Sequence, residues 1–537
     1  MPSSSKSAIV VGAGPGGLAA AMLLAKAGVR VKVVEAQPFV GGRTSTLHDA
    51  GYSFDRGPTF FLYPRILRET FAACGYDLFA ECPMERLDPQ YRLVFGARSP
   101  DGVGDRGKQT HLDATPDVDR MEQEIARLSP ADAPGFRRFM AENTTKLDHF
   151  QPILEQPFDK LTDFLRPNVL RSASLVRPWR QLYGEIGRFF KDPRLNLAFT
   201  FQGKYLGMSP FQCPSLFSIL AFLEYEYGVW HPIGGCGQVS KRMAEIVEEL
   251  GGEVSTGEPV EQLLFENDGK AGGDRVVGVR TSEGEQTADA VVVNADFAAA
   301  MKNLTPNAKR KRWTDQKLAK KKYSCSTLMF YLGLEGTQPD LPHHTIYLSS
   351  DYERNLADIE KGRPLGPDPS VYVQNACVTD PSLAPAGCST LYVLVPTANT
   401  HAAGGSAGGS AIDWHAERDR LRPIVFEQLA KLGVADAEER VRVEHTIAPN
   451  DWRDDHRIYR GATFNLAHSL DQMLYWRAHN RFEDFGGAYI VGGGTHPGSG
   501  LPTIYSSARI TTEALLDDLG LPMPTEESPA PAHGSAA

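Results

Sequence analysis

A glycine-rich turn close to the amino terminus constrains the fold of this chain more than any other feature of its sequence. Residues 8–11 are apolar and mostly β-branched, residues 12–17 read GAGPGG, and an alanine- and leucine-rich stretch then runs from 18 to 27 and is followed by Gly28. This order predicts a strand, a tight turn, a helix and a glycine after the helix end.

The glycines of this turn have separate physical tasks. Gly12 permits the tight turn, Gly14 lets the backbone approach a pyrophosphate, and Gly17 lets the helix pack against the strand. A second apolar run, residues 31–34, ends in Glu35. This acid follows Gly17 by roughly 20 positions, the spacing of a carboxylate that accepts hydrogen bonds from ribose hydroxyls. The strand, the turn, the helix and the acid together predict a dinucleotide-binding site.

Composition excludes several classes of function. The 537 residues are 42% hydrophobic and 23% charged, which is ordinary for a soluble globular protein, and the net charge of -10 argues against nucleic acid as the main partner. Seven cysteines without a CxxC pair predict neither a disulfide framework nor a metal site, and they fit a reducing, cytoplasmic compartment. No apolar run approaches the roughly 18 residues of a membrane-spanning helix. We therefore expect a protein that does not cross a membrane but is able to lie on one.

A second glycine pair follows the nucleotide acid. Gly41 and Gly42 precede Arg43, so that a backbone turn and a cation can both approach a phosphate. The alternative is a surface loop with an exposed arginine. Both interpretations are open on these three residues alone.

Residues 9–59 as a whole resemble the FAD-binding opening of the flavin amine oxidase and phytoene desaturase superfamily. The resemblance implies that the glycine turn holds the pyrophosphate and that Glu35 holds the adenosine ribose. It also implies that Gly41, Gly42 and Arg43 continue around the cofactor. This opening identifies the cofactor better than the reaction.

Three later segments narrow the resemblance to the bacterial and fungal phytoene desaturases. Residues 372–388 and 476–481 resemble segments of those enzymes, although a proline is commoner where Ala478 stands. Residues 488–502 are similar to their carboxy-terminal flavin motif. The resemblance extends over most of the chain, is weakest between residues 80 and 200, and also takes in isomerases and terminal oxidases.

The same resemblance implies further cofactor contacts. In the proteins of this superfamily, the residue at the position of Val260 touches the adenine through its backbone, and the resemblance implies the same contact for Val260. Pro502 suits the first turn of a helix, whose amino terminus would point at flavin N1 and the C2 carbonyl and stabilise the negative charge of the reduced ring. The residues that we expect to bind FAD are Gly12, Ala13, Gly14, Pro15, Gly16, Gly17, Glu35, Gly41, Gly42, Arg43, Val260, Gly494 and Thr495.

Two segments allow more than one interpretation. Residues 215–230 concentrate aromatic and aliphatic side chains, which predict either a core helix or the wall of an apolar substrate cavity. Beside them, Glu224, Glu226 and His231 are interpreted as exposed charges that flank a core helix. Residues 309–322 carry eight basic side chains. These form either a solvated face or a contact with anionic lipid headgroups, where each basic residue adds roughly 1 kcal/mol.

The expected fold class is α/β, with a Rossmann-like FAD-binding domain and an interleaved α+β substrate domain. We expect the FAD-binding domain at residues 8–90, 232–325 and 484–520, the substrate and membrane-facing domain at 91–231 and 326–483, and a disordered tail at 521–537.

The resemblance implies an FAD-dependent carotene desaturase that acts on phytoene or on its C30 analogue diapophytoene. The implied partners are a long apolar polyene, a membrane surface on which the cytoplasmic protein lies peripherally, and a quinone or oxygen as electron acceptor. The alternatives are a carotenoid isomerase, saturase or terminal oxidase, a flavin amine oxidase, and a flavin-bound lipid carrier without activity. The sequence assigns neither the residue that accepts the proton nor the oligomeric state.

Overall fold

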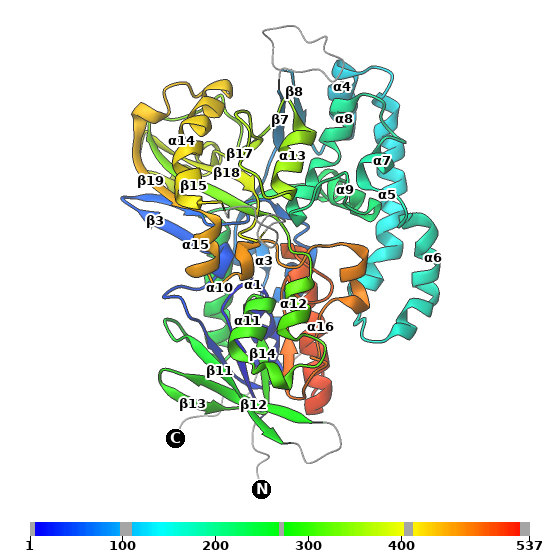
Figure 1. Ribbon diagram of the computed structural model, residues 1–537, viewed down its shortest axis with the longest axis vertical. Coiled ribbons are helices and arrows are strands. Elements are labelled where there is room, and N and C mark those ends of the chain that lie inside the picture. Colours follow the sequence, from blue (N-terminus) through cyan, green and yellow to red (C-terminus); the bar gives the residue numbers. More distant parts are fainter. Residues whose placement is uncertain (1–5, 97–109, 268–272, 402–411, 527–537) are drawn as a thin grey trace.

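The computed structural model describes residues 6–96, 110–267, 273–401 and 412–526 of the chain (Figure 1). Most of the tail predicted at 521–537 lies outside the described residues. In Figure 1 the sheet that carries the amino-terminal strand lies in the lower half of the molecule, and a second large sheet lies in the upper half beside a group of helices.

The lower sheet is parallel and has five strands. Its central strand is the apolar run that precedes the glycine turn, and alternate side chains of a strand face opposite sides of a sheet. Ala8 and Val10 accordingly pack in the core that contains helix α1, whereas Ile9 and Val11 pack in a second core on the other side. In order across the sheet, the strands are β10 (Glu253–Ser255), β2 (Arg30–Val34), β1 (Ser7–Val11), β14 (Ala290–Val293) and β20 (Ala488–Ile490).

Three helices pack together on the α1 side of this sheet, where α1 contacts both α10 and α16. The helix predicted after the glycine turn is confirmed, because α1 ends at Lys26 and Gly28 has a left-handed φ of 83°. The helix predicted to end before Gly520 is also confirmed, and Gly520 caps it with a φ of 71°. The three helices are α1 (Pro15–Lys26), α10 (Cys236–Glu249) and α16 (Leu501–Leu519).

An antiparallel three-stranded sheet and helix α11 (Phe297–Leu304) cover the other side. Val260 and Val279 of this layer share an apolar core with Ile9 and Val293 of the parallel sheet. The strands of the layer are β11 (Val260–Asn267), β12 (Asp274–Thr281) and β13 (Gly284–Thr287).

The upper sheet has seven strands, of which β16 and β7 run parallel while the other neighbours are antiparallel. It joins strands near residue 100 to strands beyond residue 320, so both large sheets draw on distant parts of the chain, as two interleaved domains require. The residue boundaries of the two domains stay a prediction. In order, the strands are β19 (Val441–Ile447), β15 (Ser326–Glu335), β18 (Cys388–Thr397), β17 (Val371–Gln374), β16 (His344–Leu348), β7 (Tyr91–Phe95) and β8 (Thr110–Ala114).

Smaller elements connect these layers. Two short sheets pair β3 (Thr46–Asp49) with β4 (Tyr52–Asp55), and β9 (Val229–Pro232) with both β5 (Phe61–Leu62) and β6 (Met84–Arg86). The remaining helices are α2 (Arg65–Cys74), α3 (Leu78–Glu81), α4 (Val118–Leu128), α5 (Ala133–Leu154), α6 (Pro167–Val176), α7 (Leu182–Ile186), α8 (Pro193–Ala198), α9 (Ser218–Tyr227), α12 (Asp315–Lys320), α13 (Tyr352–Glu360), α14 (Trp414–Lys431) and α15 (Pro449–Asp454).

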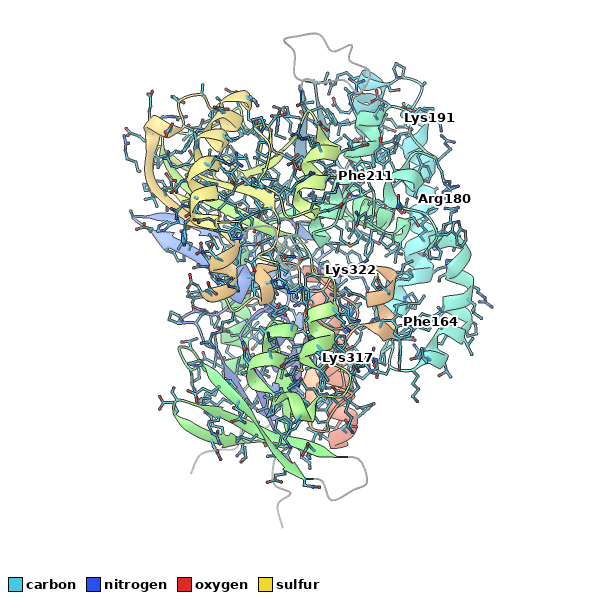
Figure 2. All side chains as sticks on the ribbon, in the orientation of Figure 1. Phe164, Arg180, Lys191, Phe211, Lys317 and Lys322 are labelled. Carbon is cyan, nitrogen blue, oxygen red and sulfur yellow. The ribbon has the colours of Figure 1, made fainter. Side chains whose placement is uncertain are left out.

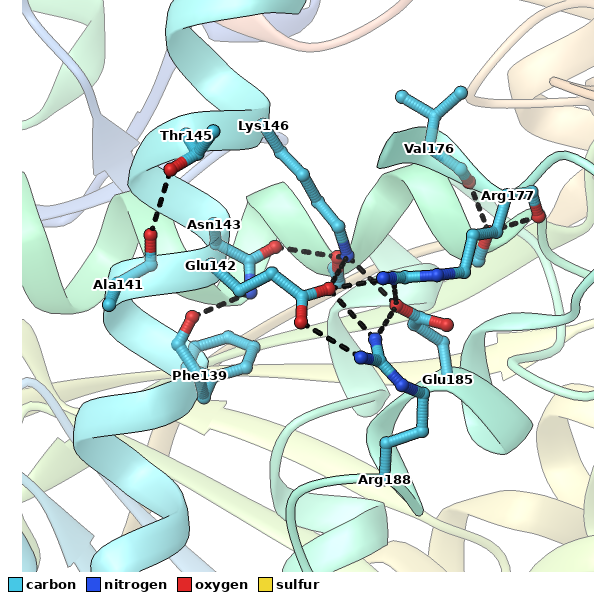
Figure 3. A network of polar contacts seen from close by, with 12 residues as sticks. Phe139, Ala141, Glu142, Asn143, Thr145, Lys146, Val176, Arg177, Glu185 and Arg188 are labelled. Carbon is cyan, nitrogen blue, oxygen red and sulfur yellow. Dashed lines mark hydrogen bonds and ion pairs between the residues drawn. The ribbon is translucent and has the colours of Figure 1, made fainter. Parts of the chain in front are cut away.

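A buried network of charges holds the helical part together (Figure 3). Lys146 of α5 is fully buried, and its Nζ lies 3.0 Å from Glu185 of α7 and 3.5 Å from Glu142. Arg177 and Arg188 bind both carboxylates. Burial would raise the pKa of Glu142, but the hydrogen bonds from Arg188 and Arg177 outweigh it and lower the pKa to about 2. Because each charge has partners of opposite sign, the protein tolerates Lys146 and Glu185 in its interior, with the three other charged groups half-buried around them.

In the part of the chain that the structure describes, no helix has both the length and the apolar character needed to span a membrane.

Candidate active site

One large cavity, of about 1230 Å³, is lined by residues of both large sheets. Val11 and Val34 are the last residues of β1 and β2, whereas Met329 and Leu394 belong to β15 and β18. In open parallel sheets, ligands bind beyond the carboxyl ends of the strands. Pockets for one small ligand usually measure about 300 to 1,000 Å³. This cavity therefore has room for a cofactor and a substrate.

The predicted glycine turn forms the polar end of the cavity. Gly12 has a φ of 100°, and its N–H donates to the carbonyl oxygen of Val34 over 2.8 Å. A Cβ on Gly17 would lie 2.3 Å from the carbonyl oxygen of Gly12, so glycine alone lets α1 pack this closely on the turn. Helix α1 begins without a side-chain cap, which leaves the N–H groups of its first turn to bind an anion. The lining residues of the turn are Gly12, Gly14, Pro15 and Gly16.

Glu35 lies at the cavity wall immediately after β2, and only 7% of it is exposed. Its Oε2 accepts a hydrogen bond from the N–H of Ala13 over 2.7 Å, and its Oε1 accepts one from Gln37 over 2.8 Å. Burial raises the pKa of the carboxyl, and these backbone hydrogen bonds oppose the rise. A carboxylate has about four acceptor positions. Glu35 can therefore accept further hydrogen bonds from a ligand in the cavity.

Gly41, Gly42 and Arg43 form a second turn against the first. The N–H of Gly41 donates to the carbonyl oxygen of Ala13 over 2.8 Å, and Gly42 and Arg43 line the cavity. Burial lowers the pKa of the Arg43 guanidinium, and the charge of Asp296 opposes this effect. No ion pair joins Arg43 to a carboxylate within the described ranges, so a phosphate in the cavity would meet a cation without a salt-bridge partner. The structure thus favours the phosphate interpretation of this turn over an exposed loop.

The carboxy-terminal motif reaches the same cavity through the predicted helix start at Pro502 and through two glycines that were not among the predicted site residues. Gly492 and Gly493, which follow β20, line the cavity together with the first turn of α16. The predicted residues Gly494 and Thr495 lie behind this lining. A Cβ on Gly494 would meet the Cβ of Phe297 at 2.3 Å, so this glycine serves the packing of α11.

Thr495 also has a structural environment. It is fully buried, and its hydroxyl donates to the carbonyl oxygen of Ala478. The signal that points to Gly492 and Gly493 is their place directly after a parallel strand, at the edge of the sheet where ligands bind. Val260 is among the residues that line the cavity, beside Pro259 and Glu261, and its backbone contact with the adenine stays a prediction.

The other end of the cavity is apolar and aromatic. Leu220 and Leu223 of α9 line it, while Ala221 and Phe222 of the same helix are buried in the core. Both interpretations of residues 215–230 therefore apply, since one side of α9 is core and another side is cavity wall. Further apolar residues of this end are Phe60, Leu62, Phe201, Leu206, Ile346, Leu348 and Val371.

The interpretation of Glu224, Glu226 and His231 as exposed charges is wrong for two of the three. Glu226 is exposed, but Glu224 and His231 have no exposed surface. The reason is that α9 is enclosed on nearly every side, so that Glu224 has no solvent-facing surface to occupy. The signal in the sequence is that residues 216–225 are apolar on all sides of a helix, which is typical of a buried helix.

The basic segment at 309–322 is only partly a solvated face. Arg310 is buried and pairs with Asp315 over 2.9 Å, and Lys309 pairs with Asp274 over 2.6 Å. Arg312 binds the 470–483 region, and Lys321 lies over the ring of Trp313. The exposed basic residues of the segment are Lys311, Lys317, Lys320 and Lys322, of which Lys317 and Lys322 are labelled in Figure 2.

A glycine turn, a buried acid and a helix amino terminus at one end of a cavity, with an apolar wall at the other, are typical of an oxidoreductase that binds a dinucleotide cofactor. A profile of the family described as flavin containing amine oxidoreductase matches residues 15–516. The chain belongs to this family.

Curated relatives place the chain within one branch of the family, the carotenoid desaturases. It is 39% identical over 514 residues to a 4,4'-diapophytoene desaturase (4,4'-diapolycopene-forming) of Methylomonas sp, with 95% of each chain covered. It is 41% identical over 520 residues to an all-trans-zeta-carotene desaturase of Myxococcus xanthus, with 95% of this chain and 93% of the relative covered.

Solved structures agree with the fold. An oxidoreductase from Methanosarcina mazei superposes with a TM-score of 0.59 at 16% identity, over 95% of this chain and 100% of the other. A putrescine oxidase double mutant superposes with a TM-score of 0.58 at 17% identity, over 96% of this chain and 100% of the other. The predicted α/β fold class and the predicted family are confirmed.

Proposed function

We propose that this protein is an FAD-dependent desaturase that introduces double bonds into phytoene or its C30 counterpart diapophytoene. One observation carries the proposal: a single cavity joins the glycine turn to an apolar wall. The curated relatives described above are desaturases of such polyenes.

The residues of the polar end would hold the cofactor. The turn at 12–17 and the free N–H groups of α1 face the pyrophosphate, Arg43 supplies a cation, and Glu35 accepts from the ribose. Gly492, Gly493 and the first turn of α16 complete the site at the other end of the cofactor. When bound there, FAD supplies the acceptor for the hydride that leaves the substrate.

The residues of the apolar end would hold the polyene. Such a substrate has no polar group, so recognition depends on apolar burial, worth about 25 cal/mol per Å². Phe60, Leu220 and Ile346 offer apolar surface for this purpose, and the wall excludes water from the reacting carbons. We further propose that residues 8–90, 232–325 and 484–520 form the cofactor domain, and residues 91–231 and 326–483 the substrate domain.

The test is to mix the purified protein, FAD and liposomes that carry phytoene or diapophytoene, with a quinone or oxygen as electron acceptor. New visible absorption from a longer conjugated system supports desaturation. An isomerase or saturase would instead require pre-reduced flavin and leave the number of double bonds unchanged or lowered. An amine oxidase would release ammonia and peroxide from an amine, and a lipid carrier would bind the polyene without any spectral change.

We also propose that the protein lies peripherally on a membrane, on the cytoplasmic side, where its substrate is dissolved. Among the described residues, exposed large apolar side chains concentrate at 161–179 and at 470–476. The backbone N–H of Lys322 donates to Gln472, so the second segment adjoins the basic segment, and Asp159, just before the first segment, lies 3.9 Å from His479, just after the second. The exposed apolar residues are Leu161, Leu165, Leu170, Trp179, Leu470 and Trp476.

Sedimentation with vesicles tests this placement. Burying one large apolar side chain contributes roughly 1.5 to 3 kcal/mol. The double variant Leu165→Ser, Trp179→Ser should therefore bind anionic vesicles at least about tenfold more weakly than the wild type. Val378→Ser removes an exposed apolar residue from a different segment and serves as the control. Equal vesicle binding of the double variant and the wild type contradicts the placement.

A further inference from the structure

Lys204 is a charged residue at the apolar end of the cavity. It belongs to a short 3₁₀ helix (Phe201–Leu206), and three of its neighbours in that helix line the cavity with it. Among the described residues that line the cavity, the other lysines, arginines and acids lie in segments 35–43, 261–302 and 453–460. The first contains Glu35, the second directly follows Val260, and the third carries Arg457, whose charge acts on Glu35. Lys204 is therefore set apart from the charged groups of the cofactor end.

The ammonium group of Lys204 has no partner in the protein. Within the part of the chain that the structure describes, its Nζ forms neither a hydrogen bond nor an ion pair. Glu360 acts on it through its charge, but the Glu360 carboxylate accepts a hydrogen bond from the Gln212 amide over 2.7 Å. The buried Lys146, by contrast, is paired with Glu185. An enclosed cation without a partner is costly, so Lys204 needs an explanation beyond packing.

The exposed surface of Lys204 faces the cavity. The side chain is partly exposed and lines the cavity, and its Nζ keeps accessible surface, unlike the enclosed hydroxyl of Tyr205 beside it. Burial lowers the pKa of the ammonium group, and the neighbouring Cys325 and Glu360 oppose this effect. Cys325 also lines the cavity. Protein atoms therefore surround Lys204 on its other sides, and a ligand in the cavity can reach its ammonium group.

A cation in an apolar wall favours a particular class of ligand. In ligand pockets, a few polar groups among apolar side chains fix the orientation of the ligand. An ammonium group has three donors and no acceptor, so its partner is an oxygen that carries partial or full negative charge. A carbonyl or carboxylate oxygen at the end of a hydrocarbon chain meets both requirements, because the chain covers the apolar wall while the oxygen pairs with Lys204. Diapophytoene has no such oxygen and would leave Lys204 without a partner.

We propose that Lys204 binds the carbonyl or carboxylate oxygen of an otherwise apolar chain ligand. Two ligands share this chemistry: a polyene that is oxidised at one terminal carbon, and an isoprenoid quinone that serves as electron acceptor. The inference rests on the proposed function, which brings both kinds of ligand to this cavity. In either case the ammonium group decides which end of the ligand lies at Lys204 and how far the chain extends toward the cofactor end.

The experiment measures binding rather than turnover. The purified full-length protein, saturated with FAD and immobilised on a resin, is equilibrated with detergent micelles that carry one ligand, and the retained ligand is extracted and quantified. The ligands are diapophytoene, a C30 polyene with a carboxylate on one terminal carbon, and a menaquinone. Lys204→Met removes the charge and keeps an unbranched stem, and Lys204→Arg keeps the charge. Lys361→Met, at an exposed lysine outside the cavity lining, is the matched control.

We expect Lys204→Met to bind at least one of the two oxygen-bearing ligands about 10- to 100-fold more weakly than the wild type, as for a lost hydrogen bond from a charged group. Its affinity for diapophytoene should stay within about threefold, and Lys204→Arg and Lys361→Met should keep most of the affinity for every ligand. Lys204→Met should also unfold at an equal or higher denaturant concentration, because it removes an enclosed cation that has no partner in the protein. A lysine with a structural role alone would show the reverse, lower stability and unchanged binding.

The outcomes identify the source of the oxygen. Weaker binding of the acid alone assigns it to the substrate, weaker binding of the quinone alone assigns it to the electron acceptor, and weaker binding of both shows that Lys204 receives either ligand. If Lys204→Met retains both ligands within about threefold of the wild type, or if the wild type retains neither, the inference is overturned. Should Lys204→Met fail to fold, Lys204→Gln, which keeps a polar group and loses the charge, decides.

Failure of the proposed function shows in a different measurement. A wild type that desaturates neither phytoene nor diapophytoene refutes the proposed function in the liposome assay described above. The retention of the acid and the quinone does not depend on that reaction, so the two failures are distinguishable.

Discussion

Gly17→Ala adds a methyl group at the point where helix α1 packs closely against the glycine turn. The new Cβ would lie 2.3 Å from the carbonyl oxygen of Gly12 and 2.8 Å from the side chain of Asn294. Gly12 is backbone in a closed turn, so it has little freedom to give way. Ordinary van der Waals contact begins near 3.4 Å, and helix α1 must therefore withdraw from the turn by about 1 Å.

The free-energy cost of this withdrawal, and the loss of FAD affinity that follows from it, can be calculated. Overpacking of a close-packed interior costs about 1 to 3 kcal/mol, and the higher helix propensity of alanine recovers up to about 1 kcal/mol of it. The shift also moves the N–H groups at the start of α1 away from the pyrophosphate that they would bind. A loss of about 1 to 2 kcal/mol in binding corresponds to roughly 5- to 30-fold weaker FAD affinity.

The assay is titration of the FAD-free protein with FAD, combined with denaturant unfolding. Gly184→Ala is the matched control, because Gly184 is also helical and nothing lies within 4 Å of the Cβ that it would gain. We expect this control to keep its FAD affinity and to unfold at equal or higher denaturant concentration. If Gly17→Ala binds FAD as tightly as the wild type, the argument from helix packing is refuted.

Three further predictions concern charge. Arg43→Met should weaken FAD binding by roughly 10- to 100-fold, as expected for a lost hydrogen bond to a charged group. Arg30→Met, at the exposed start of β2, is the control and should leave the FAD affinity unchanged in the same titration. Because burial opposes and two arginines favour its ionisation, the pKa of Glu142 falls from the ordinary 4.5 to about 2 on folding. The stability that the ionised Glu142 contributes is therefore complete above about pH 5 and is lost as the pH falls toward 2. The free energy of unfolding, measured across this pH range, should fall accordingly. A free energy of unfolding that does not change with pH would contradict this prediction. Glu185→Gln removes the carboxylate closest to the buried Lys146 and should lower the free energy of unfolding, measured in urea, by roughly 3 to 5 kcal/mol. An unchanged midpoint of the urea transition would count against a stabilising role of this charge network.

Local sequence signals predicted the elements that build the cofactor end. The strand, the glycine turn and helix α1 follow from residues that are adjacent in the chain, and so does the end of α16 at Gly520. Glu35 and Arg43 were identified because they stand at fixed distances from that turn. The predictions of the strand, the turn and the helix ends succeed because such features depend on the conformational preferences of a few neighbouring residues, whereas the roles of Glu35 and Arg43 toward FAD stay predictions.

The same signals failed where the environment of a side chain is supplied by distant segments. Gly494 and Thr495 belong to the predicted motif, but contacts with Phe297 and Ala478 hold them behind the cavity lining, and their contact with FAD stays a prediction. In the basic segment at 309–322, Lys309 and Arg312 pair with Asp274 and Glu483 from elsewhere in the fold, whereas Arg310 and Lys321 find their partners, Asp315 and Trp313, within the segment itself.

By itself, then, the sequence determined the cofactor class, the α/β fold and the family, because these depend on short patterns that fold locally. The tertiary structure alone decided which charged groups are buried. Glu224 was indistinguishable from its neighbour Glu226 along the chain, and it differs because Tyr91, which is 133 residues away, closes over it and supplies a hydrogen bond. Burial and pKa arise from such long-range contacts, which no local pattern encodes.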